Sequence, residues 1–219
     1  MGVAICDIEL VKEEYSTLEV FEREGDVVFS GELILNHVFN DVHMTGKFFL
    51  EIVVPRDFPL ALPITRELSN SINKNYPHCS PNGELCLASE LELRIFFLQT
   101  TSMYDFIEKY IIPYLYTYRF YEEYGVYPFG ERSHGTMGNL EYLKELFGVE
   151  TWKQVLDIML FVVNSSYRGH LLCPCGSNKR IRNCHGDILK KAMDAGLQDE
   201  CSAILTELSM KYDGKERNG

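Results

Sequence analysis

The first half of the chain alternates between apolar and polar positions in a manner typical of β-strands. Residues 27–39 alternate in part and end before Asn40 and Asp41, which together form a turn signal. Residues 48–54 are rich in aromatic and β-branched side chains, and they end at Pro55, which cannot donate to a ladder. The pattern therefore predicts an antiparallel meander with short turns over these residues.

Helical periodicity is clearer in the second half. Apolar residues at helical spacing predict a helix over 102–117, which Pro113 would kink or end early. Thr151, followed three residues later by Gln154, forms a capping-box signature. The other predicted helices span 7–15 (where a strand fits almost as well), 140–147 with Asn139 as cap and Gly148 at its end, 152–163, 187–194 and 197–211. Strands followed by helices favour the α+β class.

Charged residues are distributed unevenly along the chain. The net charge is −11 over 219 residues. Residues 1–168 carry 13 basic against 25 acidic residues, whereas residues 169–219 carry 8 against 7. This change in composition predicts a boundary near Gly169, between an acidic main part and a small module over 169–219. The negative charge argues against direct nucleic-acid binding, because phosphate contacts need a basic surface.

Several protein classes are excluded by composition. An aromatic content of 12% supplies enough burial for a folded core. No run of 18 apolar residues is present, so we expect no membrane span and no membrane partner. The start of the chain lacks a basic region followed by an apolar one, unlike a secretory signal. The seven cysteines are therefore interpreted as thiols or metal ligands of a cytoplasmic protein.

One cysteine follows a tight turn within residues 76–87, Tyr-Pro-His-Cys-Ser-Pro-Asn-Gly-Glu-Leu-Cys-Leu. The Pro-Asn-Gly sequence builds the turn, since Asn and Gly tolerate positive φ. Leu85 and Leu87 flank Cys86 and can anchor it against a core. A thiolate is a nucleophile, and residues 88–101 after it are interpreted as a loop. On these residues alone, a nucleophile and a buried structural cysteine both remain open.

Two elements in this order resemble the ubiquitin-conjugating enzyme family. The first is a strand followed by Pro-x-x-aromatic-Pro-x-x-x-Pro, here residues 55–63, and the second is Gly-x-aliphatic-Cys-Leu, here residues 83–87. The resemblance covers roughly residues 1–130 and implies a main domain with a UBC-like antiparallel meander and flanking helices. Residues 131–168 are then a helical extension that precedes the small module. The resemblance also implies that Cys86 carries a protein or modifier C-terminus as a thioester, which a lysine amine then attacks.

The sequence departs from the family around this cysteine. The family usually has His-Pro-Asn about ten residues earlier, and its Asn is linked to oxyanion stabilisation or loop structure. Here His78 lies eight residues before Cys86 and is followed by Cys-Ser, while Asn82 lies four residues before it. His78 and Asn82 are therefore both candidates for that role. The Trp that the family has after the active site is missing, since the only Trp is Trp152, which indicates a divergent, bacterial-type member.

The tail contains four potential metal ligands close together. Cys-x-Cys, eight residues and then Cys-His supply three thiolates and one imidazole, from Cys173, Cys175, Cys184 and His185. This set matches a closed tetrahedral zinc site. Residues 173–186 resemble the SEC-C motif, which is also found at the end of the bacterial SecA translocation ATPase. The resemblance implies a structural zinc and a protein-binding role for a small helical tail.

Together the resemblances indicate a cysteine-dependent transferase similar to conjugating-enzyme-like proteins of bacterial CBASS anti-phage operons. The implied partner there is the C-terminus of a cGAS-like nucleotidyltransferase. The alternative is a catalytically inactive UBC-fold adaptor that binds partner proteins, which the unusual His78 region favours. A redox protein using Cys79 and Cys86 is a third interpretation, although the Cys-x-x-Cys spacing of such proteins is missing there.

Overall fold

The computed structural model describes residues 5–130, 133 and 135–216, except for the side chains of residues 5, 6 and 211–216. It divides into two compact units, Met1–Glu131 and Arg132–Gly219. The first unit contains an antiparallel sheet and helices, and the described part of the second contains helices joined by loops. The predicted α+β class is confirmed. The predicted helical extension and tail both lie in the second unit, and a boundary after residue 168 stays a prediction.

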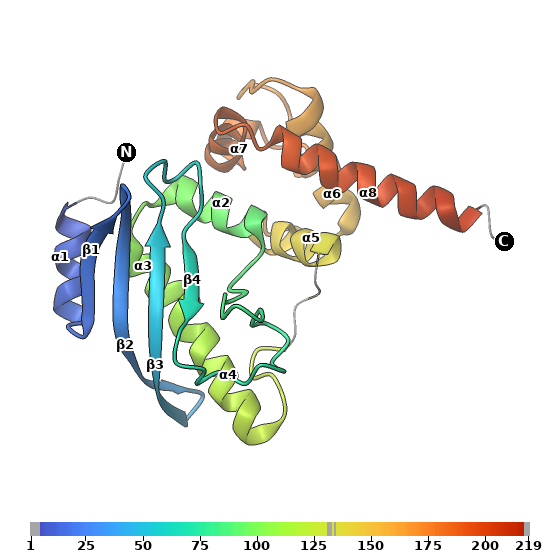
Figure 1. The fold of residues 1–219 in the computed structure, drawn as a ribbon. Coiled ribbons are helices and arrows are strands. Elements are labelled where there is room, and N and C mark those ends of the chain that lie inside the picture. The colour runs from blue at the N-terminus through green and yellow to red at the C-terminus, as the bar shows by residue number, and fades with distance from the viewer. Residues whose placement is uncertain (1–4, 131–132, 134, 217–219) are drawn as a thin grey trace. The chain divides into compact units, whose positions relative to one another are not determined.

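The first unit is built on a four-stranded antiparallel sheet whose strands pair in chain order, β1-β2-β3-β4 (Figure 1). Its elements are α1 (Ile5–Glu14), β1 (Leu18–Arg23), β2 (Asp26–Phe39), β3 (Val42–Val54), β4 (Ile64–Glu67), α2 (Glu90–Gln99), α3 (Met103–Phe106), a π-helical turn (Ile107–Ile111) and α4 (Ile112–Tyr124). Asn40 and Asp41 have φ of 46° and 62°, as a type I′ turn requires. The predicted meander is confirmed as β2 and β3, and β1 and β4 extend it on either side.

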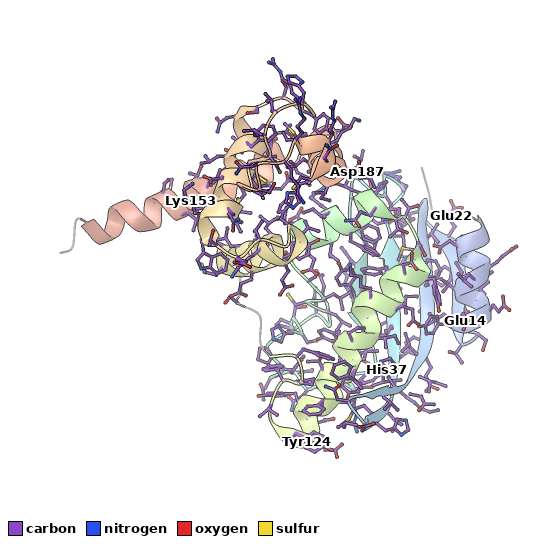
Figure 2. The ribbon with its side chains drawn as sticks, turned by 180° about the vertical axis from the view of Figure 1, so that it is seen from behind. Glu14, Glu22, His37, Tyr124, Lys153 and Asp187 are labelled. Carbon is purple, nitrogen blue, oxygen red and sulfur yellow. The ribbon has the colours of Figure 1, made fainter. Side chains whose placement is uncertain are left out.

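One face of the sheet forms the core with α4. Leu33 and Leu35 of β2 are buried, and they alternate with more exposed neighbours, as the period of a strand requires. Tyr116 of α4 is almost fully buried in the same cluster. Figure 2 shows His37 of β2 beside α4, which ends at Tyr124, and the ring centroids of His37 and Tyr116 are 5.9 Å apart. The helix and the sheet thus share one apolar layer.

Pro113 does not end its helix. A proline lacks an N–H, and its ring collides with the carbonyl four residues earlier, here that of Lys109. The π-helical turn comes directly before α4, and Pro113 lies in the first turn of α4, where a proline is tolerated. The helical run therefore continues from Met103 to Tyr124, beyond the predicted end at 117.

The prediction of a loop over residues 88–101 was wrong, because this segment contains α2. The hydroxyl of Ser89 accepts a hydrogen bond of 3.2 Å from the backbone N–H of Glu92, which caps the helix. Five side chains of α2 are buried: Leu91, Leu93, Ile95, Phe96 and Phe97. The first residues of α2 alternate between polar and apolar side chains, and this alternation obscured the helical period. The Ser-x-x-Glu sequence that begins at Ser89 is a helix start signal that could have revealed it.

The second unit is helical. Its elements are α5 (Gly135–Leu146), α6 (Trp152–Asn164), a short 3₁₀ turn (Ile181–Asn183), α7 (Gly186–Asp194) and α8 (Gln198–Glu216). α6 buries one apolar face, formed by Val155, Ile158, Met159 and Val162. α5, α7 and α8 all pack against α6. None of the helices in the described residues is long and apolar enough to cross a bilayer.

The helix ends in this unit test three sequence predictions. The capping box is confirmed: the Thr151 hydroxyl accepts from the backbone N–H of Gln154 at 3.3 Å, and the Gln154 side chain accepts from the backbone N–H of Thr151 at 3.0 Å. The prediction that Asn139 caps a helix was wrong, because α5 begins at Gly135 and contains Asn139. Gly148, with φ of 55°, follows the end of α5 as predicted.

Candidate functional sites

The segment before Cys86 pairs with β4 as a short extended piece. The backbone N–H of Leu85 donates to the carbonyl of Thr65 at 2.9 Å, and the N–H of Glu67 donates to the carbonyl of Gly83 at 2.8 Å. Leu85 is buried, whereas Cys86 is exposed. Because successive side chains of an extended segment point to opposite faces, burial of Leu85 turns Cys86 outward. The interpretation of Cys86 as a buried structural cysteine is therefore not supported.

The turn before this segment depends on Gly83 and Asn82. Gly83 has φ of 83°, and a Cβ on it would lie 2.3 Å from the carbonyl oxygen of Glu67. The side-chain oxygen of Asn82 accepts from the hydroxyl of Ser80 and, at 3.3 Å, from the backbone N–H of Glu84. The structure therefore gives Asn82 a part in building the turn, and its role beside an oxyanion stays a prediction.

His78 lies opposite Cys86. The carbonyl of His78 accepts the backbone N–H of Cys86 at 2.8 Å, and the N–H of Ser80 donates to the carbonyl of Glu84 at 2.9 Å. These two bonds make residues 78–80 and 84–86 a short antiparallel ladder. Directly opposite residues in such a ladder have Cβ atoms about 4.5–5.5 Å apart, on one face. The ladder thus brings together the backbones of the two predicted site residues, while the ring of His78 packs against those of Tyr76 and Tyr127 at centroid distances of 5.5 and 5.7 Å.

Cys79 lies on the other face of this ladder. It pairs with Leu85 and packs, half-buried, against the core of the first unit. Burial, with a further contribution from the carboxylate of Glu67, raises the pKa of Cys79. Cys79 and Cys86 are both free thiols, and their alternation along the ladder places them on opposite faces. This arrangement argues against a redox pair formed by the two.

Two tyrosines of α4 hold the loop that leads to Cys86, and sequence analysis missed them. The hydroxyl of Tyr114 donates to the carbonyl of His78 at 2.8 Å. One turn later, the hydroxyl of Tyr118 accepts from the backbone N–H of Asn73 at 3.0 Å and lies 3.1 Å from the carbonyl of Ser71. Their spacing of four was the signal that could have identified a shared face, although the predicted helix ended at residue 117, one residue before Tyr118.

Tyr114 is a hydrogen-bond donor and not a base. Burial raises its pKa far above the usual value for tyrosine, and the negative charges that Cys79, Tyr76 and Cys86 would carry when ionised raise it further. The phenol therefore stays protonated throughout the physiological range. Its proton is available for the bond to the carbonyl of His78.

The four predicted metal ligands lie together in the second unit. Their ligand atoms are all within 4.8 Å of one another. The sulfur atoms of Cys175 and Cys184 are 3.6 Å apart, and Nδ1 of His185 lies 3.2 Å from the sulfur of Cys173 and 3.4 Å from that of Cys184. Tetrahedral zinc with bonds of about 2.3 Å to sulfur places its sulfurs roughly 3.8 Å apart. The cluster fits such an ion.

The thiols of this cluster do not ionise equally. Burial raises the pKa of Cys173 to about 12. Burial also acts on Cys175, but hydrogen bonds from the hydroxyl and backbone N–H of Ser177, and from the thiols of Cys173 and Cys184, lower its pKa to about 6. The cluster therefore stabilises one thiolate by itself, and a cation is needed to compensate the charge of further thiolates.

No protein-family model matches this chain, and no curated protein matches it at a significant level. Support for a function therefore comes from the residues and their geometry.

Proposed function

We propose that the first unit is a ubiquitin-conjugating-like acyl carrier with Cys86 as its nucleophile. The observation that carries this proposal is the placement of Cys86: its thiol is exposed, while its backbone is bonded to His78 and its neighbour Leu85 is buried. A rigid backbone with an outward thiol suits a group that must present an acyl chain to a second protein. Residues 55–63, the first element that resembles the family, are also packed into this unit. The buried ring of Phe58 lies edge-on to that of Phe97 in α2, with the ring centroids 4.8 Å apart.

In the proposed reaction, the Cys86 thiolate attacks the carbonyl carbon of an activated protein C-terminus. The bond from that carbon to its leaving group breaks, and a thioester forms. An amine then attacks the same carbon, the Cys86 thiolate departs, and the amine's proton passes to a solvent base. The carbonyl of His78 accepts from the backbone N–H of Cys86, and the side-chain oxygen of Asn82 accepts from the N–H of Glu84 in the preceding turn. An oxyanion needs an N–H donor, so the imidazole of His78 and the side-chain amide of Asn82 are both proposed for that role.

The proposed substrate follows from the resemblance to CBASS proteins. The acyl donor would be the C-terminus of a protein, and a cGAS-like nucleotidyltransferase is the specific proposal. The second unit would hold a structural zinc through Cys173, Cys175, Cys184 and His185. Four protein ligands leave no open coordination position, so the ion would rigidify this unit and take no part in the chemistry.

The test compares Cys86→Ala with Cys79→Ala. Each protein is purified from cells without reducing agent, and its intact mass is measured before and after thiol treatment. We expect a heavier, thiol-sensitive adduct on the wild type and on Cys79→Ala, and none on Cys86→Ala. If Cys86→Ala retains full biological activity, the transferase proposal fails and the chain acts as a protein-binding adaptor.

A further inference from the structure

The turn between α5 and α6 contacts the metal cluster through His185. α5 ends in a Schellman motif, in which the N–H groups of Gly148 and Val149 bond back to carbonyls of α5 at 3.0 and 3.1 Å. That motif does not use the carbonyl of Phe147, which lies 2.8 Å from Nε2 of His185. A carbonyl only accepts, so Nε2 carries the proton and Nδ1 presents its lone pair to the cysteine sulfurs. Phe147 thus selects the tautomer that a metal needs.

Gln154 makes a second link from this turn to the cluster. Its side-chain oxygen accepts from the backbone N–H groups of Glu150 and Thr151 at 3.1 and 3.0 Å, at the start of α6. Its side-chain nitrogen donates to the carbonyl of the ligand residue Cys175 at 2.9 Å. A single side chain therefore caps α6 and also holds the backbone of a metal ligand.

We propose that the metal site belongs to the whole second unit and not to the Cys/His segment alone, with Gln154 as the positioning residue that couples the start of α6 to Cys175. A bound ion fixes Cys175 and His185, and these in turn fix the Gln154 side chain and the Phe147 carbonyl. Metal binding then stabilises the α5–α6 turn as well as residues 171–186. The inference rests on the proposed metal site and is independent of the chemistry of Cys86.

The first test measures zinc affinity in the full-length chain by competition with a chelator. Gln154→Met keeps the length of the side chain, adds no charge, and removes the donor to Cys175. Thr151→Ala is the matched control, because it removes the hydroxyl half of the capping box, together with the bond of 3.0 Å from this hydroxyl to the Gln154 oxygen, and keeps the Gln154 donor to Cys175. We expect Gln154→Met to lower zinc affinity by about tenfold, as lost support of a metal ligand does. Thr151→Ala should leave it unchanged.

The second test needs no variant. Hydrogen exchange of the wild type is compared with zinc bound and after chelation. The inference expects the amides of Glu150 and Thr151 to exchange faster without metal, together with those of residues 171–186. Acceleration confined to residues 171–186, or equal zinc affinities of Gln154→Met and the wild type, would overturn it. The metal content of the freshly purified wild type is measured separately. If the wild type contains no metal, the proposed metal site itself is overturned.

Discussion

The hydroxyl of Tyr114 and the carbonyl oxygen of His78 are 2.8 Å apart, and that same oxygen accepts the backbone N–H of Cys86. One acceptor therefore joins a buried helix to the segment that carries the exposed thiol. The position of Cys86 depends in this way on α4, which is remote in sequence, as well as on the turn that precedes it.

Removal of this hydroxyl tests the connection. Tyr114→Phe should lower the free energy of unfolding by about 1 kcal/mol, the usual contribution of one hydrogen bond. It should also speed hydrogen exchange at the Cys86 amide, because the His78 carbonyl loses its second partner. Urea unfolding and hydrogen exchange measure the two effects. Tyr116→Phe is the control, since its hydroxyl donates to the carbonyl of Val42 at 3.0 Å and should leave the Cys86 amide unchanged.

A second prediction concerns the approach of Gly83 to β4. Gly83→Ala should lower the free energy of unfolding by about 3 kcal/mol, because it combines a positive φ with a clash against the Glu67 carbonyl. Gly125→Ala is the matched control: its φ is 72°, and a Cβ there meets nothing within 4 Å, so it should cost only about 1 kcal/mol. Urea unfolding measures both free energies. If the two variants lose the same amount, the close approach of Gly83 to the Glu67 carbonyl does not contribute to stability.

The thiols should differ in their rates of alkylation near neutral pH. Burial raises the pKa of Cys201 to about 11, and burial with Glu67 raises that of Cys79, so both hold less thiolate than an ordinary cysteine. Cys86 is exposed and should react before Cys79 and Cys201. Mass spectrometry of the zinc-loaded protein after brief iodoacetamide treatment would identify the labelled residue. Labelling of Cys79 ahead of Cys86 would contradict the described burial.

Loss of two metal ligands should destabilise the second unit selectively. Cys173→Ser combined with Cys175→Ser should abolish zinc binding and the cooperative unfolding of α5–α8, while the unfolding of the first unit is unchanged. Metal content and calorimetry measure these effects. Cys201→Ser is the control, because Cys201 is buried outside the cluster, and its replacement should lower stability without loss of zinc.

Periodicity predicted the elements whose burial follows a simple pattern. β2 and β3 were found because their alternation is long, and α6 because Thr151 and Gln154 form a readable start signal. β1 and β4 were missed. β1 exposes four of its six side chains and buries only Leu18, and β4 has only four residues, too few to establish a period.

The candidate sites were predictable to different degrees. Ligand spacing alone identified the metal cluster, because Cys and His at these intervals are a local signal. The surroundings of Cys86 depend instead on contacts between distant residues. The ladder between His78 and Cys86 follows from a turn and was within reach of sequence reasoning, whereas the bond from Tyr114 requires the packing of α4, which no local pattern encodes.

The order of strands in the sheet has a consequence for how the first unit forms. Each strand pairs with the strand that precedes it in the chain, so little loop entropy is lost at each step, and the meander can assemble during synthesis. The Cys86 segment joins β4 only afterwards, and its anchor Tyr114 is made later still. A nascent chain that ends before α4 would therefore lack both the helix that covers the sheet and the hydroxyl that anchors the Cys86 segment. Synthesis itself delays the positioning of Cys86 until the unit is complete.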